Sequence, residues 1–127
     1  MNNITESIAR KRLRKLHNDP KHPLCMLKNK LKTYFKDFDL LDNLSEVVST
    51  KANFDDLLIT LDHPSRSPAD TYYVDSDHVL RTATSAHQTE MMRRGYRRAL
   101  VIGDVYRKDT IDRTHYQVFH EMQGIKV

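Results

Sequence analysis

Apolar side chains recur every three or four residues between Pro23 and Phe38. This spacing places them on one side of an α-helix, while the lysines of the same segment fall largely on the other side. Pro23 suits the first helical position, where no N–H donor is needed. Such a stripe usually faces a protein core, so we expect this helix to pack against the rest of the fold. The stripe consists of Leu24, Leu27, Leu31, Tyr34, Phe35 and Phe38.

After residue 42 the pattern changes to short runs that are rich in β-branched and aromatic residues, which predict strands. Polar loops are predicted at 62–68, which holds two prolines, and at 107–118, between the last two strands. The predicted strands are 46–50, 71–74, 79–81, 99–106 and 119–127.

Two local signals mark turns and helix ends. Ser85 is predicted to cap a helix that ends at Gly95, and Asn53 is predicted to cap a turn that carries Phe54 and Leu57. Helices and strands in this order predict an α+β fold, built around an antiparallel sheet that helices flank.

The composition excludes several classes of protein. A length of 127 residues corresponds to one domain. No apolar run approaches the roughly 18 residues of a membrane span, so we expect no membrane partner. Cys25 is alone, which excludes a disulfide scaffold. Three glycines cannot form a Gly-rich phosphate loop. The seven histidines show no zinc-site spacing, so we expect no metal held by protein side chains alone.

Charge is distributed unevenly along the chain. Residues 1–36 hold ten Lys and Arg against two acids, and residues 81–127 hold nine against five. Residues 37–80 hold two basic residues against ten acidic ones. The two basic ends could therefore meet phosphate groups, whereas the acidic middle could not.

Two basic clusters each allow two interpretations. The run Arg10-Lys11-Arg12-Leu13-Arg14-Lys15 could contact RNA or belong to a mitochondrial presequence, or it could be a solvated, frayed helix. The cluster Arg93-Arg94-Gly95-Tyr96-Arg97-Arg98 could bind RNA backbone or could be the solvated end of a helix.

The loop between the last two strands carries residues that suit a nucleotide. Arg107 follows one strand, Asp109 lies two residues on, and His115 and Phe119 lie on the return. An arginine can neutralise a phosphate, an acid can accept from an amine, and a phenylalanine can stack on a base. Together they indicate a nucleotide site without a phosphate-binding glycine loop.

These segments resemble a known family. Gly103-Asp104-Val105-Tyr106-Arg107-Lys108-Asp109, followed by Thr114-His115-Tyr116 and Phe119-His120, resembles motif 2 of class II aminoacyl-tRNA synthetases, and in particular the single-chain organellar phenylalanine enzymes. Five further segments occur in that family's order. They are His22-Pro23-Leu24, Asn53-Phe54-Asp55, Asp62-His63-Pro64-Ser65-Arg66, Leu80-Arg81 and Thr84-Ser85-Ala86-His87-Gln88.

The resemblance implies an enzyme that activates phenylalanine with ATP and transfers it to tRNA(Phe), with Mg²⁺ bridging the nucleotide phosphates. It implies that Arg107 is the catalytic residue and contacts the α-phosphate. ATP would be bound by Arg107, Asp109, His115 and Phe119. Phenylalanine and the adenylate would be bound by Ser85, Ala86, His87, Gln88, Thr114, His115, Tyr116, Glu121, Met122 and Gln123.

This chain departs from the family pattern in the amino-acid pocket. The family has Gln and then Glu where this chain has Glu121 and Gln123, and it often has His where Ala83 stands. Side chains two apart on a strand share a face, so a carboxylate remains on the expected side. We expect partial compensation with weaker phenylalanine binding. Glu46 and Thr60 replace common prolines near motif 1.

The resemblance also implies a fold that is incomplete at the C-terminus. Val127 lies inside the return strand of motif 2, so a missing C-terminal half or a second chain would have to supply motif 3. We expect residues 1–19 to form a basic N-terminal segment, residues 20–127 to be the first part of the catalytic domain, and the chain alone to be inactive. The alternative is a non-catalytic nucleotide- or RNA-binding protein derived from such a domain. The mitochondrial matrix is the compartment that the resemblance implies, and the cytoplasm is the alternative.

Overall fold

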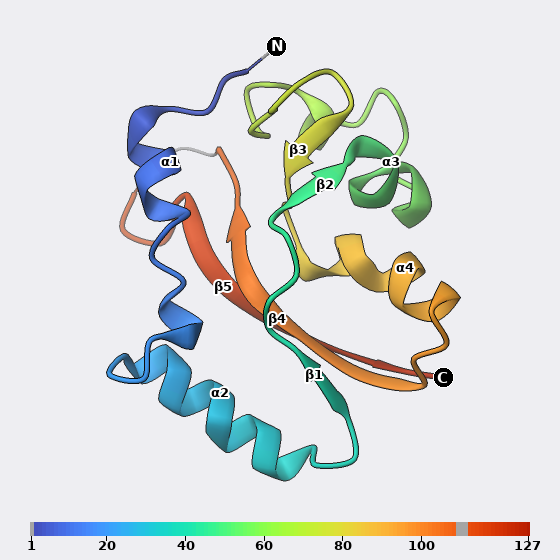
Figure 1. Ribbon diagram of the computed structural model, residues 1–127. Coiled ribbons are helices and arrows are strands. Elements are labelled where there is room, and N and C mark those ends of the chain that lie inside the picture. The colour runs from blue at the N-terminus through green and yellow to red at the C-terminus, as the bar shows by residue number, and fades with distance from the viewer. Residues whose placement is uncertain (1, 109–111) are drawn as a thin grey trace.

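The computed structural model describes residues 2–108 and 112–127, in which helices and short 3₁₀ turns (η) surround a central β-hairpin (Figure 1). The helices are α1 (Glu6–Lys11), α2 (Pro23–Tyr34), α3 (Thr50–Asn53) and α4 (Gln88–Arg93). The 3₁₀ turns are η1 (Leu16–Asn18), η2 (Asp55–Leu57), η3 (Pro64–Arg66) and η4 (Thr84–His87). The strands are β1 (Asp39–Leu41), β2 (Val47–Ser49), β3 (His78–Leu80), β4 (Arg98–Tyr106) and β5 (Val118–Lys126).

The main sheet has the order β1-β4-β5 and is mixed rather than purely antiparallel. β4 and β5 pair antiparallel along their whole length, as predicted. β1 pairs parallel with β4, an interaction that the sequence pattern did not predict. β2 and β3 form a second, two-stranded antiparallel sheet, and of the predicted strand at 71–74 only Tyr73 makes a bridge, to Val79. The α+β class is confirmed.

The β4–β5 hairpin has two differently covered faces. Val101 and Ile125 pack against Met91 of α4 on one face. Tyr106 points to the other face, where it packs against Ile8 of α1. In Figure 1, α1 and α2 accordingly lie on one side of the hairpin, and α3 and α4 lie on the other. Because successive side chains of a strand point to opposite faces, one set packs towards α4 and the other packs towards α1.

Helix α2 begins at Pro23 as predicted but ends at Tyr34, before Phe35 and Phe38, and its apolar stripe is not buried as expected. His22 caps the helix, because its ring accepts a hydrogen bond from the N–H of Leu24. Leu27, Tyr34 and Phe35 are 52%, 73% and 43% exposed, whereas Lys28 is only 6% exposed. The Nζ of Lys28 binds the Asp42 carboxylate at 2.7 Å. The prediction of a core-facing stripe is wrong because the described fold covers only one edge of it.

Two predicted caps are also corrected. Asn53 does not cap the turn that carries Phe54 and Leu57, because η2 has no side-chain cap. Asn53 instead ends α3, which Ser49 caps, and its buried side-chain amide donates to Thr82. Ser85 lies inside η4, and the following helix α4 has no side-chain cap. Gly95 does end that region, and its φ of +84° suits a residue without a Cβ.

The basic N-terminal segment is partly tied to the fold. Arg12 and Lys15 both bind the carboxylate of Glu46, at 2.8 Å and 3.0 Å. Burial alone would raise the pKa of Glu46, but its own backbone N–H and these two cations lower the pKa to about 2. Glu46 therefore anchors the segment at a position where the family resemblance expects a proline. No helix among the described residues is long and apolar enough to cross a membrane.

Candidate nucleotide and amino-acid site

Arg107 is placed by the end of β4 and by the segment that precedes η4. Its backbone N–H donates to the carbonyl of Gln117, and its Nε donates to the carbonyl of Thr82 at 3.0 Å. The guanidinium carbon lies 5.1 Å from the ring centroid of Phe119. The structure thus brings together two of the residues that the sequence predicts to bind ATP.

Beside Arg107 is a hollow of about 420 Å³, a volume within the usual range for small-molecule sites. Ser85 and Ala83 line it on one side, and Asp70 and His63 line it on another. The hollow therefore joins the predicted phosphate contact to one predicted amino-acid contact. Gln88, at the start of α4, does not line it.

Glu121 holds η4 in place. Its Oε1 accepts hydrogen bonds from the backbone N–H and the Oγ1 of Thr84, at 2.8 Å and 2.9 Å. Gln123 lies on the same face, but its Oε1 is 3.4 Å from the Thr84 hydroxyl, which makes a weaker contact. Because Thr84 is fully buried, this carboxylate satisfies two groups that have no access to water. Glu121 thus fixes the segment that carries Ser85.

We expect Glu121→Ala to lower the free energy of unfolding by about 2 kcal/mol, because it leaves the buried N–H of Thr84 unpaired and leaves the Thr84 hydroxyl only its long contact with Gln123. Gln123→Ala is the matched control and should cost under about 1 kcal/mol, since the Gln123 contact is long and bonds the same hydroxyl. Urea unfolding followed by circular dichroism measures both. Equal losses in the two variants would contradict the role of Glu121 as an anchor.

A buried ion pair lies behind the site and was not found from the sequence. Arg81 and Asp104 are 2% and 1% exposed, and they meet at 2.9 Å. Arg81 Nε also donates to the Asp104 carbonyl, while the Tyr106 hydroxyl donates to the other carboxylate oxygen at 2.7 Å. Burial, followed by the Asp104 hydrogen bond, raises the pKa of Tyr106. The only sequence signal for this cluster is Gly103, whose missing side chain leaves room for the guanidinium.

His87 belongs to this buried cluster. Its Nε2 lies 3.1 Å from Arg81 Nη1 and accepts its hydrogen bond. Burial, together with the Arg81 charge, lowers the pKa of His87 to about 4, so the ring is neutral at pH 7. Ala86, the preceding residue, packs in the apolar cluster of Phe54 and Val79.

The other predicted site residues are spread over the loop and the opposite face. Thr114, His115 and Tyr116 are exposed on the loop, and Asp112 accepts a hydrogen bond from the ring of His115. That bond, with the N–H and hydroxyl of Thr114, lowers the pKa of Asp112 to about 2. Met122 faces away from Arg107, towards α2. Asp109 lies outside the described residues.

Within residues 2–108 and 112–127, no three His, Cys, Asp or Glu side chains come together as metal ligands.

The fold corresponds to a known class of protein. The family model described as "tRNA synthetases class II core domain (F)" matches residues 7–127, so the chain belongs to that family. Phenylalanine–tRNA ligase, chloroplastic/mitochondrial, of Arabidopsis thaliana is 53% identical over 99% of this chain and 30% of that protein. The mitochondrial phenylalanine–tRNA ligase of Dictyostelium discoideum is 47% identical over 98% of this chain and 29% of that protein. This chain therefore spans about 30% of the length of these relatives.

A solved structure supports the same fold. Pyrrolysyl-tRNA synthetase from Desulfitobacterium hafniense superposes with a TM-score of 0.64 and 21% sequence identity. The match covers 91% of this chain and 43% of that chain. The resemblance inferred from the sequence motifs is confirmed at the level of family and fold.

Proposed function

We propose that this chain carries the motif 2 part of a phenylalanine–tRNA ligase that works in mitochondria. The observation that carries the proposal is the position of Arg107 over Phe119, beside a hollow that Ser85 lines. The names of the relatives support phenylalanine as the amino acid and an organelle as the compartment. Its substrates would be ATP, phenylalanine and tRNA(Phe).

Arg107 would supply positive charge where the phenylalanine carboxylate attacks the α-phosphate of ATP and pyrophosphate leaves. The stacking of Arg107 on Phe119 is worth only about 0.5–1 kcal/mol at an exposed site. A charge-assisted hydrogen bond to a phosphate is worth about 1.5–3 kcal/mol, so the guanidinium can leave the ring for a nucleotide. The ring of Phe119 would then be available to stack on the adenine.

Glu121 and Ser85 would act on the amino-acid side. Because Glu121 fixes η4 through Thr84, the Ser85 hydroxyl keeps its place at the edge of the hollow. Mg²⁺ would come with the nucleotide phosphates, where it neutralises charge on the leaving pyrophosphate, and the described residues would not need to ligate it.

The experiment uses the protein as its own cell makes it. An antibody against residues 2–36 would capture it from isolated mitochondria, and the captured protein would be assayed for ATP–pyrophosphate exchange. We expect exchange that depends on phenylalanine and not on leucine or tyrosine. Exchange with neither phenylalanine nor any other amino acid would contradict the proposal.

The role of Arg107 has its own test in the same native protein. We expect Arg107→Ala to lower kcat/KM for ATP in the exchange reaction at least about 10-fold, because one charge-assisted phosphate contact is lost. Arg98→Ala removes the same charge at the opposite end of β4 and is the matched control, for which we expect less than a twofold change. A normal kcat/KM in the Arg107 variant would remove Arg107 from the nucleotide site.

One observation favours a second function. The Glu121 carboxylate is already engaged by Thr84, which leaves it less available for a phenylalanine ammonium group. A protein with this arrangement could bind nucleotide or RNA without catalysis. Calorimetric titration with ATP, with and without phenylalanine, separates the two functions: a ligase binds both, whereas a non-catalytic relative binds ATP alone or only RNA.

A further inference from the structure

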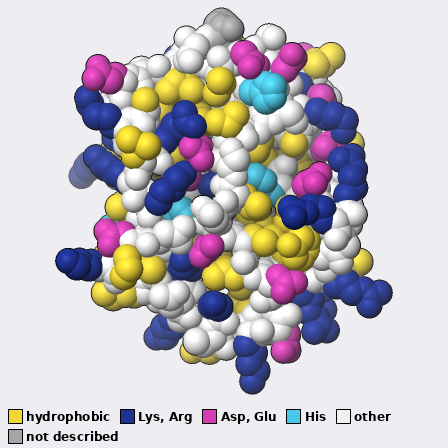
Figure 2. All heavy atoms as spheres, viewed as in Figure 1, with side chains coloured by type: hydrophobic (Ala, Val, Ile, Leu, Met, Phe, Trp, Pro, Cys, Tyr) yellow, Lys and Arg dark blue, Asp and Glu magenta, His cyan; other side chains and the backbone are white. Residues whose placement is uncertain are grey.

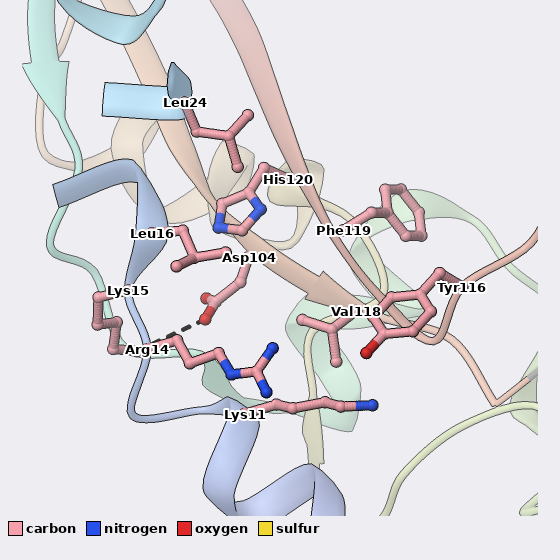
Figure 3. A pocket seen from close by; sticks show the side chains of 10 residues that line it. All are labelled: Lys11, Arg14, Lys15, Leu16, Leu24, Asp104, Tyr116, Val118, Phe119 and His120. Carbon is pink, nitrogen blue, oxygen red and sulfur yellow. Dashed lines mark ion pairs between the residues drawn. The ribbon is translucent and has the colours of Figure 1, made fainter. Parts of the chain in front are cut away.

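A second hollow, of about 330 Å³, lies between the N-terminal segment and the start of β5 (Figure 3). Lys11, Arg14 and Lys15 of the N-terminal segment form one wall. Tyr116 and Val118, on the return of the loop, form the other. Phe119 also lines this hollow, and in Figure 3 its ring points away from the three cations. The hollow therefore adjoins the stack of Arg107 on Phe119 without including Arg107.

The cations of the N-terminal segment divide into two groups. Arg12 and Lys15 bind Glu46, and Lys15 also lies 3.9 Å from Asp104. Lys11 and Arg14 form no ion pair with any acid in the described part of the chain. Figure 2 shows Lys and Arg side chains at the surface over α1 and the segment after it. Two cations thus remain available at the edge of the hollow.

An aromatic ring faces these two cations. The Nζ of Lys11 lies 4.4 Å from the ring centroid of Tyr116, which is 52% exposed. The hydrogen bond from Lys11 also lowers the pKa of the Tyr116 phenol. Aromatic rings beside basic groups are the combination with which proteins hold single-stranded nucleic acid, where bases stack and phosphates pair with cations.

The interior of the hollow is mainly apolar but includes two polar side chains, His120 and Asp104. His120 lines it, and the Nε2 of His120 is buried without a hydrogen-bond partner among the described residues. The His17 ring packs behind it, with the two ring centroids 5.3 Å apart, and its Nδ1 is likewise unpartnered among the described residues. Buried polar atoms without a hydrogen-bond partner are uncommon, so a polar group of a ligand would stabilise this site by bonding to them. The Asp104 carboxylate is already paired with Arg81, so the interior offers no free positive charge to a phosphate. The phosphates therefore belong at the rim, with Lys11 and Arg14, and a neutral base belongs inside.

We infer that this hollow binds one nucleotide of a single RNA strand, with its base against Tyr116 and its two flanking phosphates on Lys11 and Arg14. The inference rests on the proposed function, because the RNA would be the tRNA substrate of that enzyme. The hollow would bind a part of this RNA that does not react. A free mononucleotide carries phosphate at one end of its ribose only. A nucleotide within a strand has a phosphate at both its 5′ and its 3′ side, so it can pair with Lys11 and Arg14 at the same time.

The test measures the affinity of the native protein, captured as for the exchange assay, for a fluorescently labelled single-stranded RNA of 12 nucleotides, by anisotropy. We expect Lys11→Ala with Arg14→Ala to raise Kd at least about 10-fold at low salt. Each lost phosphate contact should also reduce the slope of log Kd against log salt concentration by about 0.7. Tyr116→Leu should raise Kd roughly fivefold or more without changing that slope, because stacking involves no counterions.

The matched control is Lys30→Ala with Lys32→Ala, which removes the same charge from the exposed side of α2, away from the hollow. We expect this control to change Kd less than twofold. Equal weakening in both pairs would overturn the inference, since a general positive field would then explain the binding. Full competition by AMP at the same nucleotide concentration would also overturn it, in favour of a free-nucleotide site.

Failure here is distinguishable from failure of the proposed function. ATP binding by the Lys11→Ala, Arg14→Ala double variant should stay within twofold of wild type, because neither side chain lines the hollow beside Arg107. Circular dichroism would show that each variant is folded. If the variants lose RNA binding while the matched control keeps it, the RNA site in the hollow is supported. If the protein shows no phenylalanine-dependent exchange, only the proposed enzymatic function is contradicted.

Discussion

We expect Gly103→Ala to lower the free energy of unfolding by about 3–5 kcal/mol. A Cβ at this position would lie 2.1 Å from Nη2 of Arg81, which is far inside contact distance. The guanidinium cannot move aside, because it is 2% exposed and bonded to both the carbonyl and the carboxylate of Asp104. Displacing it breaks a buried ion pair, which typically costs this much. Total stabilities are about 5–15 kcal/mol, so a large part would be lost.

Gly124→Ala is a close control, because it adds the same methyl group to the partner strand of the same hairpin. The nearest atom to its Cβ is Leu100 Cδ2, at an ordinary 3.6 Å. We expect this variant to stay within about 0.5 kcal/mol of wild type. Urea unfolding midpoints measure both variants, and similar midpoints for the two would show that Arg81 has room to move.

The second large effect is a dependence of stability on pH that arises from His87. Burial and the neighbouring Arg81 charge lower the pKa of His87 to about 4, against 6.5 for the free side chain. The unfolded chain therefore takes up a proton at a higher pH than the folded chain does. The free energy of unfolding is unaffected by His87 above pH 6.5, falls between pH 6.5 and pH 4, and falls no further below pH 4. At about 1.4 kcal/mol for each pH unit, the loss is about 3 kcal/mol.

His87→Gln isolates this contribution, because an amide oxygen can still accept the hydrogen bond from Arg81 and does not titrate. We expect the variant to match wild type at pH 7.5 within about 1 kcal/mol and to lose about 3 kcal/mol less on acidification to pH 4. Burial also lowers the pKa of His17 and His120, and both residues remain in the variant, so their effects cancel in the comparison. If the free energy of unfolding of His87→Gln fell with acidification as much as that of wild type, a group other than His87 would cause the pH dependence.

The parts of the fold that the sequence predicts best are those with local causes. β4 and β5 follow from long apolar runs, and α2 follows from its periodicity and Pro23. β1 was missed because its three residues are held in a strand only by pairing with β4, which lies far away in the sequence. The exposed stripe of α2 makes the same point, since periodicity identifies a helix but not what covers it.

In the candidate site, too, the sequence indicates the residues that lie in short motifs but not the contacts between residues far apart in the chain. Arg107, Phe119 and Ser85 are predicted site residues because short motifs carry them, and their roles stay predictions. The structure places Arg107 against Phe119 and brings Arg107 and Ser85 to one hollow. The contact between Glu121 and Thr84 joins residues 37 positions apart, so no local sequence pattern predicts it. Arg81 was overlooked as a buried residue because arginine is usually exposed, and only the neighbouring Gly103 hints at its position.

The packing of the first residues against the last strand has a consequence for the order in which the fold forms. The β4–β5 hairpin closes a short loop, β1 joins β4 across about 60 residues, and His17 meets His120 across about 100. Each doubling of a closed loop adds only about 0.6 kcal/mol of entropic cost, but contacts between distant residues form slowly. During synthesis, the partners of the N-terminal segment are made in turn: Glu46, which binds Arg12 and Lys15, comes well before β5, whereas Tyr116, which faces Lys11, comes just before it. Lys11 therefore lacks its aromatic partner in the nascent chain until synthesis reaches β5.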